Sequence, residues 1–433
     1  MKTLEDIRLE AREPKWRALN EYVGGESGEA LVSALRELYS LYDGRIIDWF
    51  AGLYDSDVGG YYYSNSARDN KTVVYKGKEY LLLPDAESTR QALAFWEASG
   101  MSDAVGGAYE RAIPEQMAKE IGEFIYSLQD PDGFFYHKQW GKDIRLSRRA
   151  RDFNWCRGML RRFGITPKYK TVIDATKSEE NDEIFVPEHL KSKESFANYL
   201  ENLKIDERSY PAGNELVAQD VQIKAAGRME QCIEFLNAHQ NAENGLWHNE
   251  SNYYGVNGLL KISGLYNAAG LPLPNAMRAA KSAIAAISSD EPMGTVVDIY
   301  NTWFAVRNIL SNLREQGGDE GNEMADGIVT ELRRIAPDAI RKSREKISIF
   351  KKPDGAFSYC RNNSSEISQG APVAIPGTPE GDVNATIISS MGLIENIYLA
   401  LELEKYRVPL FVECDRQRYI ELLSENKKKN CEE

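Results

Sequence analysis

The sequence predicts an all-α protein built from helical hairpins that repeat along the chain. A unit of helix, glycine-containing turn and aromatic residue occurs about four times, at 47–61, 121–136, 229–247 and 347–359. The stretches between these units carry apolar residues at helical spacing, and no β-run is long enough to suggest a second domain. A unit that recurs at this scale indicates a repeat architecture, and the number of helical segments suits a closed ring of about six hairpins.

The copy at 229–247, MEQCIEFLNAHQNAENGLW, shows the unit most clearly. An apolar stripe at helical spacing runs through residues 232–236 and predicts a helix. Gln240 is expected to close this helix, and Gly245 supplies a backbone freedom that a Cβ atom would hinder. Trp247 then follows as the aromatic residue of the turn.

These residues also carry a resemblance to known families. Phe-Leu followed by Gln240, Gly245 and Trp247 resembles the Gln–Trp repeat of the squalene–hopene cyclases, which share an α/α toroid with the protein prenyltransferases. Gly-Gly-Tyr at 59–61 is similar to segments of sugar-active six-hairpin enzymes. The resemblance implies an (α/α)6 toroid, in which an outer ring of helices wraps an inner ring. It transfers no activity by itself.

We expect residues 1–433 to form one domain, with a loop or insertion at 165–192 and a C-terminal helix and tail at 403–433. Outer helices are expected at 27–52, 114–129, 195–203, 229–239, 274–288 and 322–350, the last with a break at Pro337. Inner helices are expected at 85–100, 152–164, 213–224, 254–269, 297–313 and 382–401. An extended excursion at 61–80 and a last helix at 415–427 complete the prediction.

Composition narrows the class of function. Lys and Arg number 53 against 66 Asp and Glu, a net charge of −13, which argues against a nucleic-acid or anionic-membrane surface. No secretory signal pattern opens the sequence, and no apolar run approaches the ~18 residues of a membrane span. The five cysteines are scattered without a CxxC pair, which is typical of a reduced, cytoplasmic protein. No metal-ligand spacing occurs, so we expect neither metal nor cofactor, and the oligomeric state stays open.

Acids and amides recur at the predicted start of nearly every inner helix. They are Asp85, Glu87, Asp152, Asn214, Asn257, Asp298, Asn301, Asp382 and Asn384. Helix capping explains any single one, because Asp and Asn oxygens accept hydrogen bonds from free backbone N–H groups. The doubled acid–amide pairs exceed that need, and in a ring these ends would converge on one polar pocket.

Aromatic and basic residues are expected beside this pocket. The aromatic candidates are Tyr61, Trp140, Trp247, Tyr254, Tyr300 and Trp303. Aromatic faces next to carboxylates and amides suit sugar rings, although core packing explains at least half of these aromatics. Arg148, Arg149 and Arg151 would bind a carboxylate such as a uronate, or else pair with surface acids.

The candidate catalytic groups are Asp85, Glu87, Asp152, Asp298, Asp382, His137 and His248. A glycoside hydrolase needs two carboxylates, whereas a uronate lyase needs a charge neutraliser and a histidine or tyrosine base. We therefore expect an enzyme that cleaves oligosaccharides by one of these routes. The alternative is a non-catalytic toroid that binds a glycan or a protein.

Isoprenoid chemistry, the activity of the squalene–hopene cyclases and protein prenyltransferases, is the least favoured alternative. The segment Asp55-Ser-Asp57-Val lacks the last acid of the cyclase Asp-x-Asp-Asp pattern. Asp298 has no cysteine two residues on, and no histidine follows His248, so the zinc ligands of the prenyltransferases have no counterpart.

Overall fold

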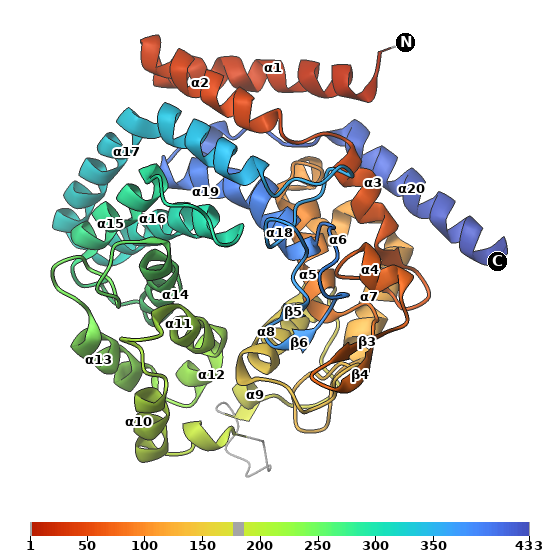
Figure 1. Cartoon of the computed structure of the whole chain (residues 1–433), viewed down its shortest axis with the longest axis horizontal. Helices are drawn as coiled ribbons and strands as arrows, with labels where there is room; N and C mark the ends of the chain where they lie inside the picture. Colours follow the sequence, from red (N-terminus) through yellow and green to blue (C-terminus); the bar gives the residue numbers. More distant parts are fainter. Residues whose placement is uncertain (1, 176–185, 433) are drawn as a thin grey trace.

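The computed structural model describes residues 2–175 and 186–432, and these are predominantly helical, which confirms the all-α prediction (Figure 1). The described strands form three two-stranded antiparallel hairpins, β1 (Tyr54–Asp55) with β2 (Gly60–Tyr61), β3 (Thr72–Tyr75) with β4 (Lys78–Leu81), and β5 (Ile367–Ser368) with β6 (Ala371–Pro372). None of the described helices combines the length and the apolar character needed to cross a bilayer.

Twenty α-helices lie in the described residues. They are α1 (Leu4–Val23), α2 (Gly25–Tyr39), α3 (Arg45–Gly52), α4 (Asn65–Asp69), α5 (Ala86–Ala98), α6 (Tyr109–Ala112), α7 (Glu115–Ser127), α8 (Leu146–Arg162), α9 (Val172–Ala175) and α10 (Lys193–Asn202). The second half contains α11 (Ser209–Ala218), α12 (Asp220–Ala225), α13 (Met229–His239), α14 (Tyr253–Ala269), α15 (Ala276–Ser288), α16 (Val297–Gln316), α17 (Gly318–Ser348), α18 (Val383–Ile387), α19 (Leu393–Ala400) and α20 (Glu413–Glu432).

Six helical segments contact one another in a circuit that returns to its start. α5 packs on α8, α8 on α11, α11 on α14, α14 on α16, and α16 on α19. A π-helical turn joins α19 to α18, and α18 packs back on α5. The segments of the circuit are buried on most sides, as the apolar residues all round 297–313 predict for α16.

Further helices cover this circuit from outside (Figure 1). α7 packs on α8, α13 on α14, and α15 and α17 on α16. α2 packs on α17 and α1, while α20 packs on α3 and α1. The first and last helices therefore lie side by side, joined by a buried ion pair in which Arg8 Nε donates to Asp415 Oδ2 at 3.0 Å.

The glycines of the four repeat turns explain why the turn motif recurs. Gly59, Gly133, Gly245 and Gly355 all have φ between +73° and +88°, a region that L side chains rarely adopt. A Cβ on Gly245 would lie 2.5 Å from the backbone nitrogen of Ala279 in α15. Each of the other three likewise abuts backbone atoms of a neighbouring segment. The motif thus presses each turn onto the next segment.

Several helix boundaries differ from the prediction. The helix expected at 27–52 is two helices, because the chain turns at 40–44 between α2 and α3. The break expected at Pro337 does not occur; α17 continues through the proline while its apolar face stays buried. α11 begins at Ser209 and α8 at Leu146, both before the predicted starts. The helix α1 was not predicted, and residues 176–185 of the predicted insertion lie outside the described residues.

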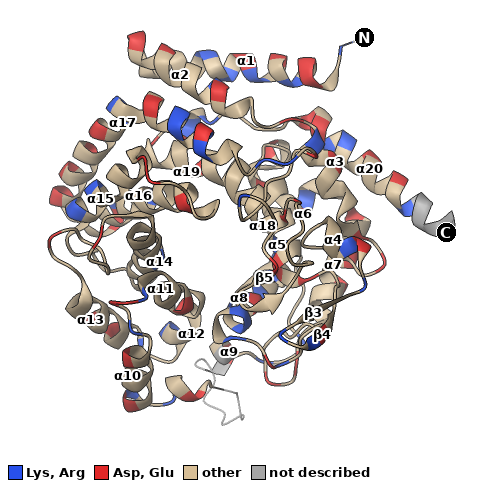
Figure 2. Cartoon of the chain, viewed as in Figure 1, with Lys and Arg blue, Asp and Glu red and all other residues tan. Residues whose placement is uncertain are grey.

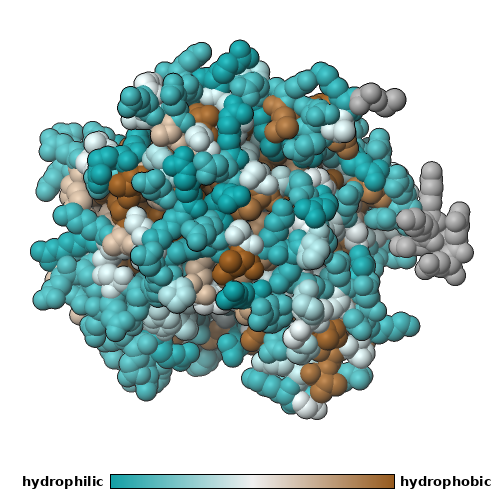
Figure 3. Space-filling view, turned by 45° about the horizontal axis from the view of Figure 1, so that its top comes forward, coloured by the Kyte–Doolittle hydropathy of each residue, from teal (hydrophilic) through white to brown (hydrophobic). Residues whose placement is uncertain are grey.

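The face of the molecule in Figure 3 is mainly polar. On the face in Figure 3, apolar side chains form small patches separated by hydrophilic ones. The most exposed large apolar residues include Val74 and Leu81 on the β3–β4 hairpin, which lies at the edge of the molecule in Figure 1.

Candidate functional site

Arg148 on α8 is the centre of a buried cluster of carboxylates. Its Nη2 donates to Asp85 Oδ1 at 2.8 Å, its Nη1 to Glu87 Oε2 at 2.9 Å, and its Nε to Asp152 Oδ2 at 3.0 Å. The guanidinium carbon lies 4.7 Å from the ring centroid of Trp140. Burial lowers the pKa of Arg148, but the three carboxylates outweigh burial and raise it overall, so the arginine stays charged.

The structure therefore brings together three predicted acids with one predicted arginine. Asp85 caps α5, and Glu87 lies in its first turn. The earlier start of α8 places Arg148 and Asp152 one turn apart on the same face, which allows their pairing. The sequence predicted Asp152 at the start of a helix, but the residue lies inside α8.

Asp152 has the most unusual surroundings of the three acids. It is 2% exposed, and its Oδ1 has no hydrogen-bond partner among the described residues. Burial raises the pKa of Asp152 to about 7, against the lowering effect of Arg148. Near neutral pH the carboxyl group is therefore partly protonated and holds a proton that it can donate.

Glu87 is held from several sides. Arg151 Nη2 lies 3.2 Å from its Oε1, and Gln91 Nε2 donates to the same oxygen at 3.3 Å. Ser368, on the β5–β6 hairpin, donates to Oε2 at 2.7 Å. The hairpin also contacts α11, because Asn214 Nδ2 donates to Gln369 Oε1 at 2.8 Å. This hairpin thus covers the carboxylate cluster and joins its two sides.

Asp382 caps α18, and Asp298, in the first turn of α16, accepts backbone N–H groups of the residues before the helix, so structural roles account for both. Asp382 Oδ1 accepts from the backbone N–H of Ala385 at 2.8 Å, and Oδ2 from Tyr359 at 2.9 Å and Ser365 at 3.3 Å. Burial raises the pKa of Asp382 to about 7, although these donors lower it.

Asp298 begins a chain of amides. Its Oδ2 accepts two backbone N–H groups before α16, and its Oδ1 accepts from Asn257 Nδ2 at 3.0 Å. Asn301 Nδ2 donates to Asn257 Oδ1 at 2.9 Å. Tyr210 on α11 lies close enough to Asn301 and Arg151 for both to lower its pKa, although burial raises it overall. The predicted amides thus connect to the arginine cluster through a tyrosine that sequence reasoning missed.

Neither candidate histidine is free to act at this cluster. His137 is buried, its Nδ1 accepts from the backbone N–H of Gln139 at 3.1 Å, and its ring also bonds the backbone of Pro84. Burial lowers the pKa of His137 to about 4, so it is neutral at pH 7. His248 accepts from the backbone N–H of Glu250 and lies edge-on to the exposed Tyr254. Both histidines stabilise turns.

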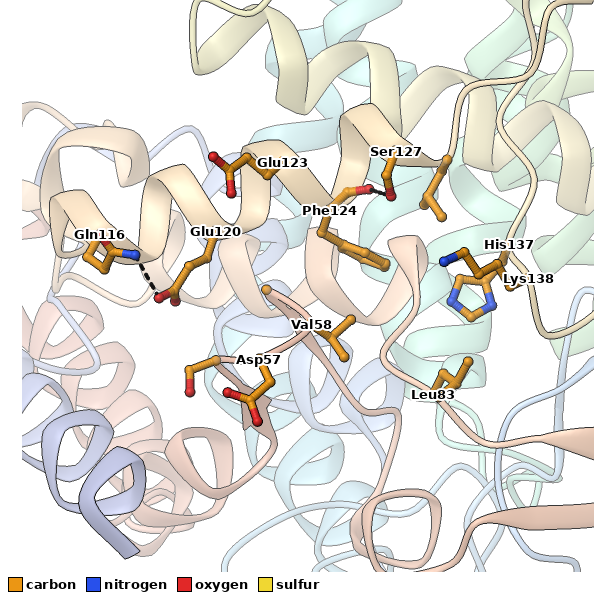
Figure 4. A pocket seen from close by; sticks show the side chains of 13 residues that line it. Asp57, Val58, Leu83, Gln116, Glu120, Glu123, Phe124, Ser127, His137 and Lys138 are labelled. Atoms are coloured by element: carbon orange, nitrogen blue, oxygen red, sulfur yellow. Dashed lines mark hydrogen bonds between the residues drawn. The ribbon is translucent and has the colours of Figure 1, made fainter. Parts of the chain in front are cut away.

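His137 lies at one end of a surface hollow of about 760 Å³ between α7 and the β1–β2 turn. In Figure 4, Glu120 on α7 lies across from Asp57 of that turn, and His137 lies at the far end. This hollow faces outward and contains none of the carboxylates bound by Arg148.

Three aromatic predictions need correction, because the rings lie in the core. Tyr61 is fully buried and its hydroxyl meets that of Tyr419 at 3.0 Å. Trp247 Nε1 donates to the carbonyl of Leu236, and Trp303 Nε1 to Ser343 Oγ. Core packing, the alternative explanation, accounts for all three.

The remaining predicted residues are dispersed. Arg149 faces away from the cluster, with its guanidinium carbon 5.0 Å from the Phe134 ring centroid. Asn384 is partly exposed in the first turn of α18. Tyr300 is partly exposed and near Phe304, and burial raises its pKa to about 12.

One stripe of each of four circuit helices remains partly accessible, although the helices are otherwise buried. The residues are Arg151 and Trp155 on α8, Tyr210 and Asn214 on α11, Lys261 and Gly264 on α14, and Tyr300, Phe304 and Arg307 on α16. Their spacing of three or four residues places them on one face of each helix. Figure 2 shows basic residues of α8 beside acidic residues of α5 on this part of the circuit.

Sequence reasoning missed Lys261, Tyr210 and Ser368. Lys261 stands alone in an apolar helix, and Ser368 lies in a polar loop without a motif. No group of three or more His, Cys, Asp or Glu side chains in the described segments could hold a metal ion. In comparisons with known proteins, no family model, curated protein or solved structure matches the chain.

Proposed function

We propose that the helices form an (α/α)6 toroid and that the chain cleaves glycosidic bonds of an oligosaccharide bound inside the ring. The contact circuit through α5, α8, α11, α14, α16 and α18–α19 supports the toroid. The repeat-turn glycines, each pressed onto a neighbouring segment, support it as well. The partly accessible stripes on the circuit helices are the surface that would line the substrate pocket.

One observation carries the catalytic proposal. Asp152 is a buried carboxyl group with one oxygen that no described donor reaches, and burial raises its pKa to about 7. A general acid needs a proton at neutral pH and an oxygen free to deliver it. Asp152 meets the first requirement and has an oxygen without a hydrogen-bond partner among the described residues, which lies buried beneath the β5–β6 hairpin, and Arg148 fixes its other oxygen. It would protonate the glycosidic oxygen as the bond to the anomeric carbon breaks.

Glu87 would supply the second carboxylate. It is ion-paired with Arg148 and Arg151, so its negative charge is held in place near Asp152. A fixed carboxylate stabilises the positive charge that develops on the sugar ring during cleavage, and it would take a proton from the water whose oxygen bonds to the anomeric carbon. The hydrolase mechanism thus uses the two acids bound to one arginine, whereas Asp298 and Asp382 maintain the helix starts.

A uronate lyase is the second candidate, and Tyr210 favours it. Arg151 and Asn301 lie close enough to lower its pKa against the raising effect of burial. A tyrosine base next to a cation and amides could remove the proton α to a neutralised carboxylate. Neither histidine offers this role, since both ring environments are engaged with the backbone.

The four described cysteines Cys156, Cys232, Cys360 and Cys414 are free. Free thiols are typical of a reducing compartment, so this observation supports the proposed cytoplasmic location.

The test is incubation of the purified chain with neutral and uronate-containing oligosaccharides. New reducing ends without ultraviolet absorbance indicate a hydrolase, and reducing ends with the absorbance of an unsaturated uronate indicate a lyase. For a hydrolase, we expect Asp152→Asn to lower kcat by at least about 100-fold, because a general acid contributes on that scale.

Asp220→Asn is the matched control. Burial also raises the pKa of Asp220, but this residue lies on α12, outside the Arg148 cluster. The control should retain wild-type turnover. Equal turnover in wild type and Asp152→Asn would refute the assigned acid, and no cleavage of any sugar would favour the glycan- or protein-binding toroid.

A further inference from the structure

Lys261 on α14 is a cation without a partner. Its side chain has no hydrogen bond or ion pair with any described residue, although it is only partly accessible. α11 fixes the root of this side chain, since a Cβ on Gly213 would lie 3.0 Å from Lys261 Cβ. An unpaired amine in such a place costs stability, because burial disfavours its charged form.

Arg151 lies close enough to Lys261 to lower the pKa of the lysine, and it is also incompletely paired. Its guanidinium carbon is 4.6 Å from the ring centroid of Trp155, and its one ion pair among the described residues is with Glu87 at 3.2 Å. The side chain is 22% exposed, in contrast to the fully buried Arg148. Arg151 therefore presents unused N–H groups on the accessible face of α8.

Three cations meet three carboxylates in this region, but they are unevenly paired. Arg148 pairs with all three carboxylates, Arg151 has one described ion pair, with Glu87 Oε1, and Lys261 has none. Arg151 disfavours the charged form of Lys261, and Glu87 favours it. Burial also keeps Asp152 partly protonated, which removes negative charge from the cluster. The donors left without an acceptor therefore belong to Arg151 on α8 and Lys261 on α14.

We infer that Arg151 and Lys261 form a binding subsite for an anionic group on the sugar, a carboxylate as in a uronic acid or a phosphate ester. An anion between the two cations would relieve their mutual repulsion and form charge-assisted hydrogen bonds with both. Trp155 and Tyr210 lie next to the subsite and would contact the sugar ring that carries the anion. The inference rests on the proposed binding of an oligosaccharide inside the ring.

The subsite also explains why these two cations are retained in the interior. Replacing an unpaired, partly buried lysine with an apolar residue of similar length ought to stabilise a protein. Retention of a destabilising charge is typical of a functional site. Lys261→Met should therefore unfold at the same temperature as wild type or higher, while it loses the anion.

The experiment measures binding to Asp152→Asn by titration calorimetry, so that turnover does not consume the ligand. The probes are a glucuronate-terminated disaccharide, its neutral glucose-terminated counterpart and glucose 6-phosphate. Lys261→Met is compared in this background with Lys281→Met, which removes an exposed lysine of α15. We expect Lys261→Met to weaken binding of an anionic probe at least tenfold and to leave the neutral probe unchanged, and Lys281→Met to change neither.

The two anionic probes identify the anion. Tighter binding of the glucuronate probe indicates a carboxylate subsite, and tighter binding of the sugar phosphate indicates a phosphate subsite; both support the inference. Equal affinity for neutral and anionic probes, no binding of any probe, or no effect of Lys261→Met would overturn it.

Cleavage assays on the wild-type chain separate this inference from the proposed function. Cleavage of neutral sugars alone, unaffected by Lys261→Met, would retain the enzyme and refute the subsite. Lys261-dependent binding of an anionic sugar without cleavage would retain the subsite and refute the enzyme.

Discussion

Asp152 and Asp382 are equally buried, and burial raises the pKa of each to about 7, yet their oxygens meet opposite surroundings. Three backbone N–H groups reach the oxygens of Asp382, whereas one oxygen of Asp152 meets no described donor. Both oxygens of Asp382 thus accept hydrogen bonds from the backbone, whereas one oxygen of Asp152 accepts none from the described residues. A raised pKa alone does not distinguish a structural acid from a reactive one; the unused oxygen does.

The largest expected effect on the free energy of unfolding comes from removing Arg148, the cation that binds Asp152. Arg148→Met leaves Asp85, Glu87 and Asp152 without their shared partner, and breaking a buried ion pair in this way costs about 3–5 kcal/mol. Urea unfolding followed by circular dichroism measures the loss. Arg161→Met, an exposed arginine on the same helix, should change the free energy of unfolding by less than about 0.5 kcal/mol. Equal stability of the two variants would show that the carboxylates do not depend on Arg148.

A smaller effect is expected at Asp382. Asp382→Asn replaces one acceptor oxygen with an amide that faces backbone donors, which costs about 1–3 kcal/mol of unfolding free energy. Asp152→Asn should cost less at pH 7, since its second oxygen has no described donor to lose. The ranking should reverse for turnover per folded molecule, which Asp382→Asn should leave intact. A larger stability loss in Asp152→Asn would contradict the comparison.

Measured over a single pH unit, the pH dependence of stability gives the smallest of these effects, about 1 kcal/mol. Below about 3.8, the ordinary pKa of Asp, the Asp152 carboxyl is protonated in both the folded and the unfolded chain, and above about 7 it is charged in both. In between, the folded chain keeps a proton that the unfolded chain releases, so the free energy of unfolding falls as pH rises. Asp152→Asn removes this slope, and its stability relative to wild type should improve from pH 4 to pH 7.

Unfolding curves recorded at several pH values measure this difference. Asp382→Asn should shift the slope in the same direction, because burial raises both pKa values. If the stability of either variant relative to wild type fell from pH 4 to pH 7, the replaced carboxyl of the wild type would be charged in the folded chain at acid pH.

The sequence predicted the features that depend on spacing and turn chemistry. The helical content, the repeat turns and the position of Asp85 at the start of α5 follow from apolar periodicity, from glycine and from capping. The pairing of Asp85 and Glu87 with Arg148 could have been predicted, since all three residues were expected at one end of the predicted ring.

The sequence did not predict features that depend on which face of a helix points inward. Tyr61, Trp247 and Trp303 have the same composition signal as pocket aromatics, but packing places them in the core. Lys261 is a single lysine among apolar residues, and nothing local marks it as interior. The run of arginines before Asp152 resembles a solvated loop, whereas burial of Arg148 against three acids makes it helical.

The contacts between α1 and the last part of the chain have a consequence for the order of folding. Arg8 pairs with Asp415, Arg12 bonds the carbonyls of Pro409 and Leu410, and Tyr39 bonds that of Val408. Partners nearly 400 residues apart meet only after the intervening helices have formed, and closing so long a loop is slow. During synthesis, α1 and α2 therefore lack the contacts with residues 408–415 until that part of the chain has been made. Formation of these contacts is a late folding step. Before it, the exposed apolar surface of the early helices would be prone to aggregation and would benefit from a chaperone.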